Sequence, residues 1–188
     1  MDSAPFPPER IEAGRVLLRR LRTDDAVAVA EAVAASLAHL RPWMPWATPT
    51  AADPLQQRAR IIDAEASWDA HTEYVYSAFR VRGDEFLGSV GLHRRAGPDS
   101  IEMGYWIHAA HAGRGYTTAA ARALIPVAFA LPGVWRVEIH CDVANHASAA
   151  IPRKLGFRLD RIEERVAQAA SETGRHMIWV LGRQGSIS

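Results

Sequence analysis

The chain has 188 residues, a length that suits one domain and supports a core without disulfide or metal crosslinks. A hydrophobic fraction of 48% and a charged fraction of 23% are ordinary for a soluble globular protein, and a formal net charge of +1 argues against nucleic acid or an anionic membrane as the main partner. The single cysteine, Cys141, excludes a disulfide framework and a cysteine-based metal site, and no secretory signal or membrane-length apolar run is visible, so we expect a cytoplasmic protein without a bound metal.

The chain predicts a loose polar leader over residues 1–13, one domain over 14–182 and a tail over 183–188. In chain order we expect a strand at 15–21, helices at 26–40 and 54–68, strands at 74–81, 86–93 and 101–108, a helix at 116–130, a strand at 134–143, a helix at 148–155, and strands at 157–166 and 175–182. Antiparallel hairpins followed by strand–helix–strand predict an α/β (α+β) protein with a mixed sheet and helices on its faces.

Turn and cap residues set several of these boundaries. Pro42 and Pro45 cannot continue the alanine-rich first helix, and Pro54 opens the second, since proline is favoured at the first helical position. The run Arg82-Gly83-Asp84 is a hairpin signal between two strand-like segments. Gly156 is expected to end the last helix as a C-cap.

The strand expected at 134–143 alternates cleanly between apolar and polar residues. Its apolar face carries Val137, Ile139, Cys141 and Val143, and its polar face carries Arg136, Glu138, His140 and Asp142. Because Cys141 lies among the apolar residues, we expect it to be part of the core rather than a reactive thiol.

A candidate anion-binding loop joins the strand at 101–108 to the helix that starts at Tyr116. The free amides of a first helical turn converge on one point, which also carries the positive end of the helix dipole and suits a phosphate. Gly113 and Gly115 allow a tight turn and a close backbone approach, and Arg114 adds a positive charge. The alternative is a connection in which the glycines serve the geometry alone.

Two other phosphate-binding motifs fit this loop poorly. A Rossmann loop would read G-x-G-x-x-G, and Thr118 stands at its last glycine position. The Gly-Lys-Ser/Thr of a P-loop is absent from this segment. A second candidate segment follows at Asn145 and Ser148, whose side chains either cap the next helix or also face a ligand between the two central strands.

Four features together resemble the GNAT superfamily of acyl-CoA N-acyltransferases, and most closely its RimJ/RimL-type branch, which acts on protein N-terminal amines and has relatives that act on small amines. They are Leu17-Leu-Arg-Arg-Leu-Arg22 with Asp24-Asp25, the hairpin end Phe86-Leu-Gly-Ser-Val-Gly-Leu92, the run Glu102-Met-Gly-Tyr-Trp-Ile107 to Gly113-Arg-Gly-Tyr116, and Asn145-x-x-Ser148 leading to Lys154-Leu-Gly-Phe157. The resemblance covers about residues 14–182. It implies a mostly antiparallel central sheet with helices on both faces and a V-shaped splay between two central parallel strands.

The resemblance also implies that acetyl-CoA or another acyl-CoA binds as co-substrate at the splay. The residues that it assigns to this binding are Tyr105, Trp106, Ile107, Gly113, Arg114, Gly115, Tyr116, Thr117, Thr118, Asn145 and Ser148. The family's loop pattern, Gln/Arg-x-x-Gly-x-Gly/Ala, aligns on Ala112, Gly115 and Thr117, so only its central glycine is matched. The loop acts through backbone amides, which alanine and threonine also provide.

For catalysis, the resemblance implies direct attack of an amine on the thioester, helped by a base that removes a proton from the ammonium. Glu102 is the first candidate for the base and His93 the second, each with the alternative of an ordinary strand residue. The resemblance to RimL-like enzymes makes Ser148 the candidate acid for the leaving thiolate, and no tyrosine follows Tyr116 to take that role instead. Trp43 and Trp46 either line the acceptor site or form a hydrophobic cap between two helices.

The sequence therefore predicts an N-acyltransferase, acetyl by first choice, whose acceptor is the primary amine of a protein N-terminus or of a small molecule. A second hypothesis is a non-catalytic acyl-CoA-binding sensor with the same fold, which the departures at Ala112 and Thr117 would suit. A nucleotide-binding protein using the same loop is the third. Edge strands of such sheets often pair between subunits, so a homodimer is compatible with this fold, although the sequence does not establish one.

Overall fold

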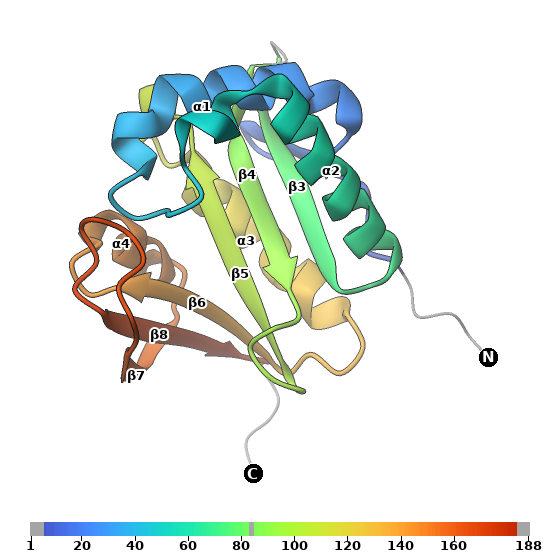
Figure 1. Ribbon diagram of the computed structural model, residues 1–188. Helices are drawn as coiled ribbons and strands as arrows, with labels where there is room; N and C mark the ends of the chain where they lie inside the picture. The colour runs from blue at the N-terminus through green and yellow to red at the C-terminus, as the bar shows by residue number, and fades with distance from the viewer. Residues whose placement is uncertain (1–5, 83–84, 184–188) are drawn as a thin grey trace.

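The computed structural model describes residues 6–82 and 85–183, and its centre is an eight-stranded sheet (Figure 1). The strands lie in the order β1-β2-β3-β4-β5-β6-β8-β7. Their bounds are β1 Arg10–Ala13, β2 Val16–Arg20, β3 Glu73–Arg80, β4 Phe86–His93, β5 Ser100–Ile107, β6 Arg136–Asp142, β7 Arg158–Glu164 and β8 Arg175–Gly182. Every neighbouring pair is antiparallel except β5 and β6, which are parallel, so the mixed and mostly antiparallel sheet is confirmed.

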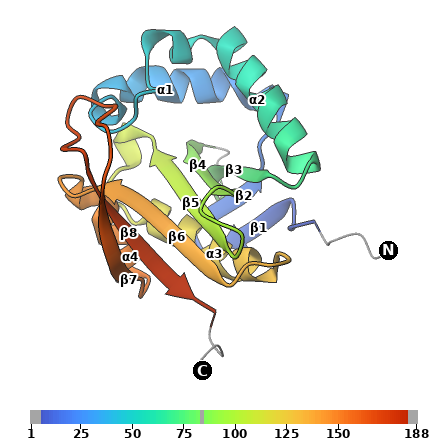
Figure 2. The same cartoon turned by 60° about the horizontal axis from the view of Figure 1, so that its bottom comes forward.

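Helices cover both faces of this sheet, as expected. The helices are α1 Ala26–Leu40, α2 Pro54–Asp69, α3 Tyr116–Ala130 and α4 His146–Lys154, with short 3-10 turns at Thr23–Asp25, Pro49–Ala52 and Ala109–His111. In Figure 2, α1 and α2 lie together on one side of the sheet, and α3 lies on the other side. The side chain of Asp53 caps α2 by accepting a hydrogen bond of 2.7 Å from Leu55 N.

The parallel strands β5 and β6 pair over only three residues each, Ser100–Glu102 with Arg136–Glu138. Beyond this point β5 continues to Ile107 and β6 to Asp142 without pairing to each other. Figure 1 shows the two strands meeting at one end and diverging toward α4. The unpaired stretch is the expected V-shaped splay, and it leaves the backbone of residues 103–107 on the β6 side free of strand hydrogen bonds.

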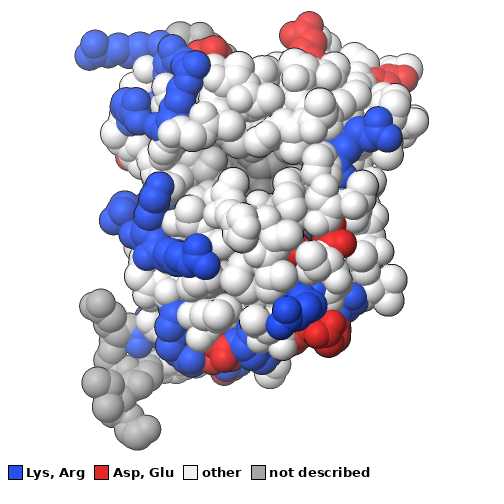
Figure 3. Space-filling model, turned by 90° about the vertical axis from the view of Figure 1, so that its left-hand side faces the viewer, with Lys and Arg blue, Asp and Glu red and all other residues white. Residues whose placement is uncertain are grey.

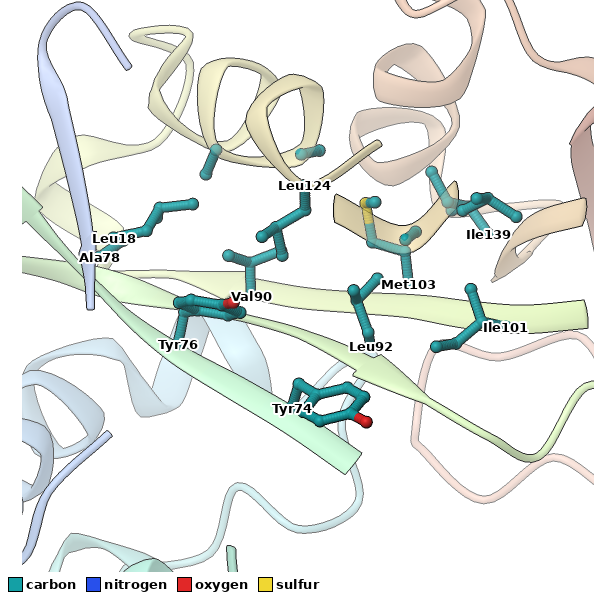
Figure 4. Close-up of a cluster of buried hydrophobic side chains, with 14 of the residues drawn as sticks. Leu18, Tyr74, Tyr76, Ala78, Val90, Leu92, Ile101, Met103, Leu124 and Ile139 are labelled. Carbon is teal, nitrogen blue, oxygen red and sulfur yellow. The ribbon is translucent and has the colours of Figure 1, made fainter. Parts of the chain in front are cut away.

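The largest hydrophobic cluster lies between the strands and α3 (Figure 4). Leu124 of α3 reaches toward Val90 of β4, and Met103 and Ile139 continue the cluster across the two diverging strands. All four side chains are at most 1% exposed. Because this cluster spans β5 and β6, it holds the two arms of the splay in place below the opening.

The structure differs from the sequence-based expectation at the N-terminus. The expectation of a loose leader is wrong for Arg10–Ala13, which form the edge strand β1 and pair antiparallel with β2. Four residues with two outward-facing charges carry too little local pattern to predict a strand, and β1 exists because β2 offers an open edge. Residues 1–5, the hairpin residues 83–84 and the tail at 184–188 lie outside the described part of the chain.

The other elements follow the expectation within a few residues. The helices α1 and α3 have the predicted bounds, and Gly156 has φ 81°, the left-handed conformation expected after a helix end. Cys141 is 6% exposed within the main core. Among the described residues, no helix is long and apolar enough to cross a membrane.

Candidate active site

Two cavities open at the splay and share one stretch of wall. The larger, of about 580 Å³, lies between the sheet and the segment that links α1 to α2, and the smaller, of about 320 Å³, lies along the loop before α3. Both are lined by Trp43, Met44, Tyr105, Trp106, Asn145 and Ser148. Figure 3 shows the hollow in this face of the molecule, with Lys and Arg side chains mainly along one side of it. A ligand that fills the smaller cavity would therefore reach into the larger one.

The smaller cavity ends at the N-terminus of α3, where the sequence predicted an anion site. Gly113 and Gly115 have φ of 72° and 81°, and both line the cavity together with Thr117 and Thr118. The first backbone hydrogen bond of α3 runs from Ala119 N to Gly115 O, so the amides of its first turn have no acceptor within the helix. Free amides and the helix dipole at one point are what a phosphate group requires.

Two residues that the resemblance assigns to this loop, Arg114 and Tyr116, do not line the smaller cavity. The Arg114 carbonyl accepts a hydrogen bond of 2.9 Å from Arg15 Nη2. The ring of Tyr116 is 7% exposed and packs under the Arg15 guanidinium, 4.9 Å from the ring centre. Arg15 thus ties the loop to the first strands of the sheet, a contact for which the sequence has no local signal.

Asn145, Ser148 and Tyr105 meet where the two cavities join. Asn145 Oδ1 caps α4 by accepting a hydrogen bond of 3.0 Å from Ser148 N, which confirms the capping prediction. The Ser148 Oγ lies 3.3 Å from the Tyr105 hydroxyl, which also donates to the Ser148 carbonyl at 3.2 Å. Burial raises the pKa of Tyr105, so its hydroxyl stays protonated and can donate.

Four polar residues form one row across strands β3 to β6, and two of them, Glu73 and His93, line the larger cavity. Register pairs Glu73 of β3 with His93 of β4, His93 with Glu102 of β5, and Glu102 with Glu138 of β6. Residues that pair directly across neighbouring strands point to the same face of a sheet, so the four side chains lie side by side. Both base candidates from the sequence, Glu102 and His93, belong to this row.

The ring of His93 lies over two glycines. A Cβ atom built on Gly91 would come within 2.9 Å of His93 Nε2, and one on Gly104 within 3.5 Å. These glycines pair with each other across β4 and β5, so they leave the space that the imidazole occupies. The Nδ1 atom lies 3.1 Å from a Glu73 oxygen, an ion-pair distance without hydrogen-bond geometry.

Glu102 is bound by Arg95 and lies close to two histidines. Arg95 donates to both of its oxygens, at 2.7 Å from Nε and 2.8 Å from Nη2. Burial alone would raise the pKa of Glu102, but the hydrogen bonds from Arg95 and the nearby His140, Arg95 and His93 outweigh it and hold the pKa below its ordinary value. Glu102 is therefore ionised at neutral pH, and its negative charge is largely offset by Arg95.

The structure adds a pair that the sequence-based site did not include. The Nε2 of His140 lies 2.7 Å from Glu138 Oε2, and its Nδ1 lies 3.7 Å from Glu102 Oε2. His140 lines the larger cavity, and Glu138 is 2% exposed. The alternation of β6 had already placed both residues on the polar face. That signal identified the face, but not that it borders Glu102.

Aromatic side chains also line the larger cavity. Trp46 packs edge-on against Trp106 with ring centres 5.8 Å apart, and the Arg60 guanidinium lies 5.2 Å from the Trp46 ring centre. Trp43 borders both cavities, whereas Trp46 borders only the larger one. Of the two interpretations that the sequence left open, this placement favours the lining of a site, although the two residues also cover the region between α1 and α2.

The matching family model is the Acetyltransferase (GNAT) domain, and it aligns with residues 15–158. This match covers well over half of the chain. The chain belongs to the GNAT acetyltransferase family. YdaF of Bacillus subtilis (strain 168), a candidate ribosomal N-acetyltransferase by its name, is 31% identical over 144 residues, which are 76% of this chain and 77% of YdaF.

Solved structures with the same fold include enzymes of the RimL and RimJ type. RimL, a ribosomal L7/L12 alpha-N-protein acetyltransferase in complex with coenzyme A, has a TM-score of 0.83 at 19% identity and covers 93% of this chain and 98% of its own. RimJ of Mycobacterium smegmatis, in complex with a CoA disulfide, has a TM-score of 0.82 at 22% identity and covers 95% of this chain and 87% of its own. The predictions of a GNAT fold and of an acyl-CoA-dependent N-acetyltransferase are confirmed.

Proposed function

We propose that this acetyltransferase modifies the primary amine of a protein N-terminus, with small-molecule amines as the alternative acceptors, and that it works in the cytoplasm. The observation that carries the proposal is the junction of the two cavities at Tyr105 and Ser148. One cavity ends at an anion-binding helix terminus, and the other has a floor of carboxylates and imidazoles. An acyl donor and an amine can therefore meet from opposite sides.

The smaller cavity fits the donor, acetyl-CoA. The free amides at the start of α3 suit its pyrophosphate, and the unpaired β5 backbone at 105–107 suits the amides of its pantetheine arm. Asn145 and Ser148 border the end of this path. When bound, acetyl-CoA supplies a thioester carbonyl that an amine attacks directly, so the protein needs no nucleophile of its own.

The larger cavity fits the acceptor. Its volume of about 580 Å³ exceeds what a single amino group needs, and its wall combines Trp43, Trp46 and Trp106 with the acidic Glu73 and Glu172. Carboxylates attract an ammonium group, and aromatic walls favour the apolar parts of the first residues of a peptide. The names of YdaF and RimL, which refer to ribosomal N-acetylation and to an alpha-N-protein acceptor, support the same class of acceptor.

The polar groups around the junction of the two cavities serve two proton transfers, one from the ammonium and one to the leaving thiolate. Glu102, His93 and the neighbouring His140 are the groups from which a base can be drawn, since all three lie on the floor of the larger cavity or next to it. Ser148, with the protonated Tyr105 hydroxyl 3.3 Å from its Oγ, is placed to give a proton to a leaving thiolate.

The test has two stages. Titration calorimetry with acetyl-CoA and succinyl-CoA, with ATP and NAD as controls, should show micromolar binding of a CoA ester alone. A thiol-release assay should then show turnover with short peptides that carry a free N-terminus and none with the same peptides N-formylated. Absence of CoA binding, or equal binding of ATP, would refute the proposal. Turnover confined to small amines would reassign the acceptor.

A further inference from the structure

Glu102 alone is a poor final acceptor for a proton. Both of its oxygens accept hydrogen bonds from Arg95, and its pKa lies below the ordinary value because these interactions outweigh its burial. A carboxylate held in this way is stabilised in its ionised form and gains little by taking a proton. The reaction nevertheless requires that an ammonium group lose one, because an ammonium has no free electron pair with which to attack.

His140 is the neighbouring group with the right geometry. Its Nε2 lies 2.7 Å from Glu138 Oε2, and the Glu138 side chain is 2% exposed. A buried carboxylate requires a hydrogen-bond donor, so Nε2 carries the ring proton of the neutral imidazole. The other nitrogen, Nδ1, then carries no proton, and its electron pair can accept a hydrogen bond or a proton.

The surroundings of Nδ1 agree with this tautomer. Arg165 Nη2 lies 3.5 Å from Nδ1, and a guanidinium can only donate, so Nδ1 acts as an acceptor in the resting state. Arg165 is also paired with Glu163 at 2.7 Å, which offsets its charge. Nδ1 also lies 3.7 Å from Glu102 Oε2, so an ammonium that takes the place of the Arg165 donor lies beside this carboxylate.

We propose that His140, oriented by the buried Glu138, takes the proton from the acceptor ammonium, and that Glu102 Oε2, 3.7 Å from Nδ1, accepts a hydrogen bond from the ammonium. One N–H bond of the ammonium breaks, its electron pair stays on the amine nitrogen, and the proton forms a new N–H bond at Nδ1. The ring becomes an imidazolium between two carboxylates. The proton then passes to solvent through the open cavity. This inference rests on the proposed function of the site.

Several other charged groups surround His140. Those on the elements around His140 are Glu73 of β3, His93 of β4 and Arg95 after it, Glu102 of β5, Glu138 of β6, Arg161 and Glu163 of β7, Arg165 after it, Glu172, and His176 of β8. The groups nearest to the ring nitrogens are Glu138 at 2.7 Å from Nε2, and Arg165 at 3.5 Å and Glu102 at 3.7 Å from Nδ1.

The kinetic test compares pH profiles of kcat/KM for a peptide acceptor. For the native chain, kcat/KM should rise with pH as one histidine loses its proton. In His140→Gln, kcat/KM at pH 7 should fall about 100-fold, and the profile should instead follow the ionisation of the acceptor amine itself. In Glu138→Gln, the histidine limb should move to lower pH, because a carboxylate that stabilises the imidazolium is lost. Free imidazole should partly restore His140→Ala.

A matched control and a second readout keep the outcomes distinct. His71, which stacks on Phe6 and lines neither cavity, is replaced by Asn, and this variant should keep the native profile. Nitrogen-15 NMR of the resting protein should find His140 protonated at Nε2, a result that does not depend on turnover.

Three results would overturn the assignment of His140: an Nδ1-protonated ring, an unchanged profile in His140→Gln, or loss of the histidine limb only in Glu102→Gln. Failure of the native chain to turn over any amine would instead count against the proposed function, and the NMR result would still decide the tautomer.

Discussion

At the scale of single residues, the site depends on charges that partly cancel. Glu102 is partly buried, which favours its neutral form, but Arg95 at 2.7 Å keeps it ionised. Because the pKa of Glu102 is lower in the folded chain than in the unfolded chain, the pair stabilises the fold above the ordinary pKa of a glutamate. That contribution is lost as the pH falls through the lowered value.

The variant Arg95→Gln should raise the pKa of Glu102, because burial then acts without its strongest opposing interaction. The measurement is a carbon-13 NMR titration of the Glu102 carboxyl. Arg94→Gln is the matched control, since the Arg94 guanidinium donates to the Pro132 carbonyl and has no contact with Glu102. Equal titration curves in the two variants would contradict the electrostatic account.

The variant Ser148→Ala should lower kcat about 10- to 100-fold while the affinity for acetyl-CoA changes by less than about 3-fold, because it removes a proton donor and leaves the cap of α4 in place. Steady-state kinetics and calorimetry separate the two effects. The exposed Ser171→Ala should match the native chain in both. If Ser148→Ala instead abolished binding with no change in kcat, Ser148 would be a ligand-binding residue rather than the acid.

At the scale of elements, the site depends on how closely β4 and β5 approach each other near the splay. Gly88 has φ 149°, and a Cβ atom there would meet the carbonyl oxygen of Trp106 and lie 2.9 Å from the Cα of Ile107. Both neighbours are backbone atoms, so neither can rotate away. The close approach keeps the free β5 edge at 105–107 directed toward the smaller cavity.

The variant Gly88→Ala should therefore lower the free energy of unfolding by about 2–3 kcal/mol, through strain and a forced separation of the two strands. It should also weaken acetyl-CoA binding. Gly182→Ala is the matched control, because a Cβ atom there meets nothing within 4 Å, and its effect should stay within about 0.5 kcal/mol. Chemical denaturation measures both variants. Equal stabilities would show that β4 and β5 can separate without cost.

At the scale of the whole molecule, the β5–β6 junction joins two halves that pair over only three residues on each strand. Strands β1 to β5 with α1 and α2 form one side of the cleft, and β6 to β8 with α4 form the other (Figure 1). The shared core around Met103 and Ile139 connects them below the opening. A ligand that contacts both sides stabilises the folded chain as a unit.

Acetyl-CoA at about 100 times its Kd should raise Tm by roughly 5–10 °C, from a stabilisation of about 2.7 kcal/mol and the size of the chain. Differential scanning calorimetry measures the shift. ATP and NAD at the same concentration should give shifts near zero. A shift with ATP as large as that with acetyl-CoA would contradict the binding of a CoA ester across the cleft.

The sequence by itself determined the features that depend on local pattern. Periodicity and proline positions located α1 and α3, the glycine loop predicted the anion site, and the alternation of β6 placed Glu138 and His140 on its polar face. These follow from the sequence because period, caps and turn residues act over a few neighbouring positions.

Only the tertiary structure decided which of these features meet. The pairing of Arg10–Ala13 with β2, the position of Arg95 over Glu102, and the approach of His140 to Glu102 join residues from separate strands. Such contacts depend on strand order, register and the splay of two strands, which are set by the packing of the whole core. The resemblance to a family supplied Glu102 and Ser148. The sheet supplied the buried Glu138, 2.7 Å from a ring nitrogen of His140, which lies next to Glu102.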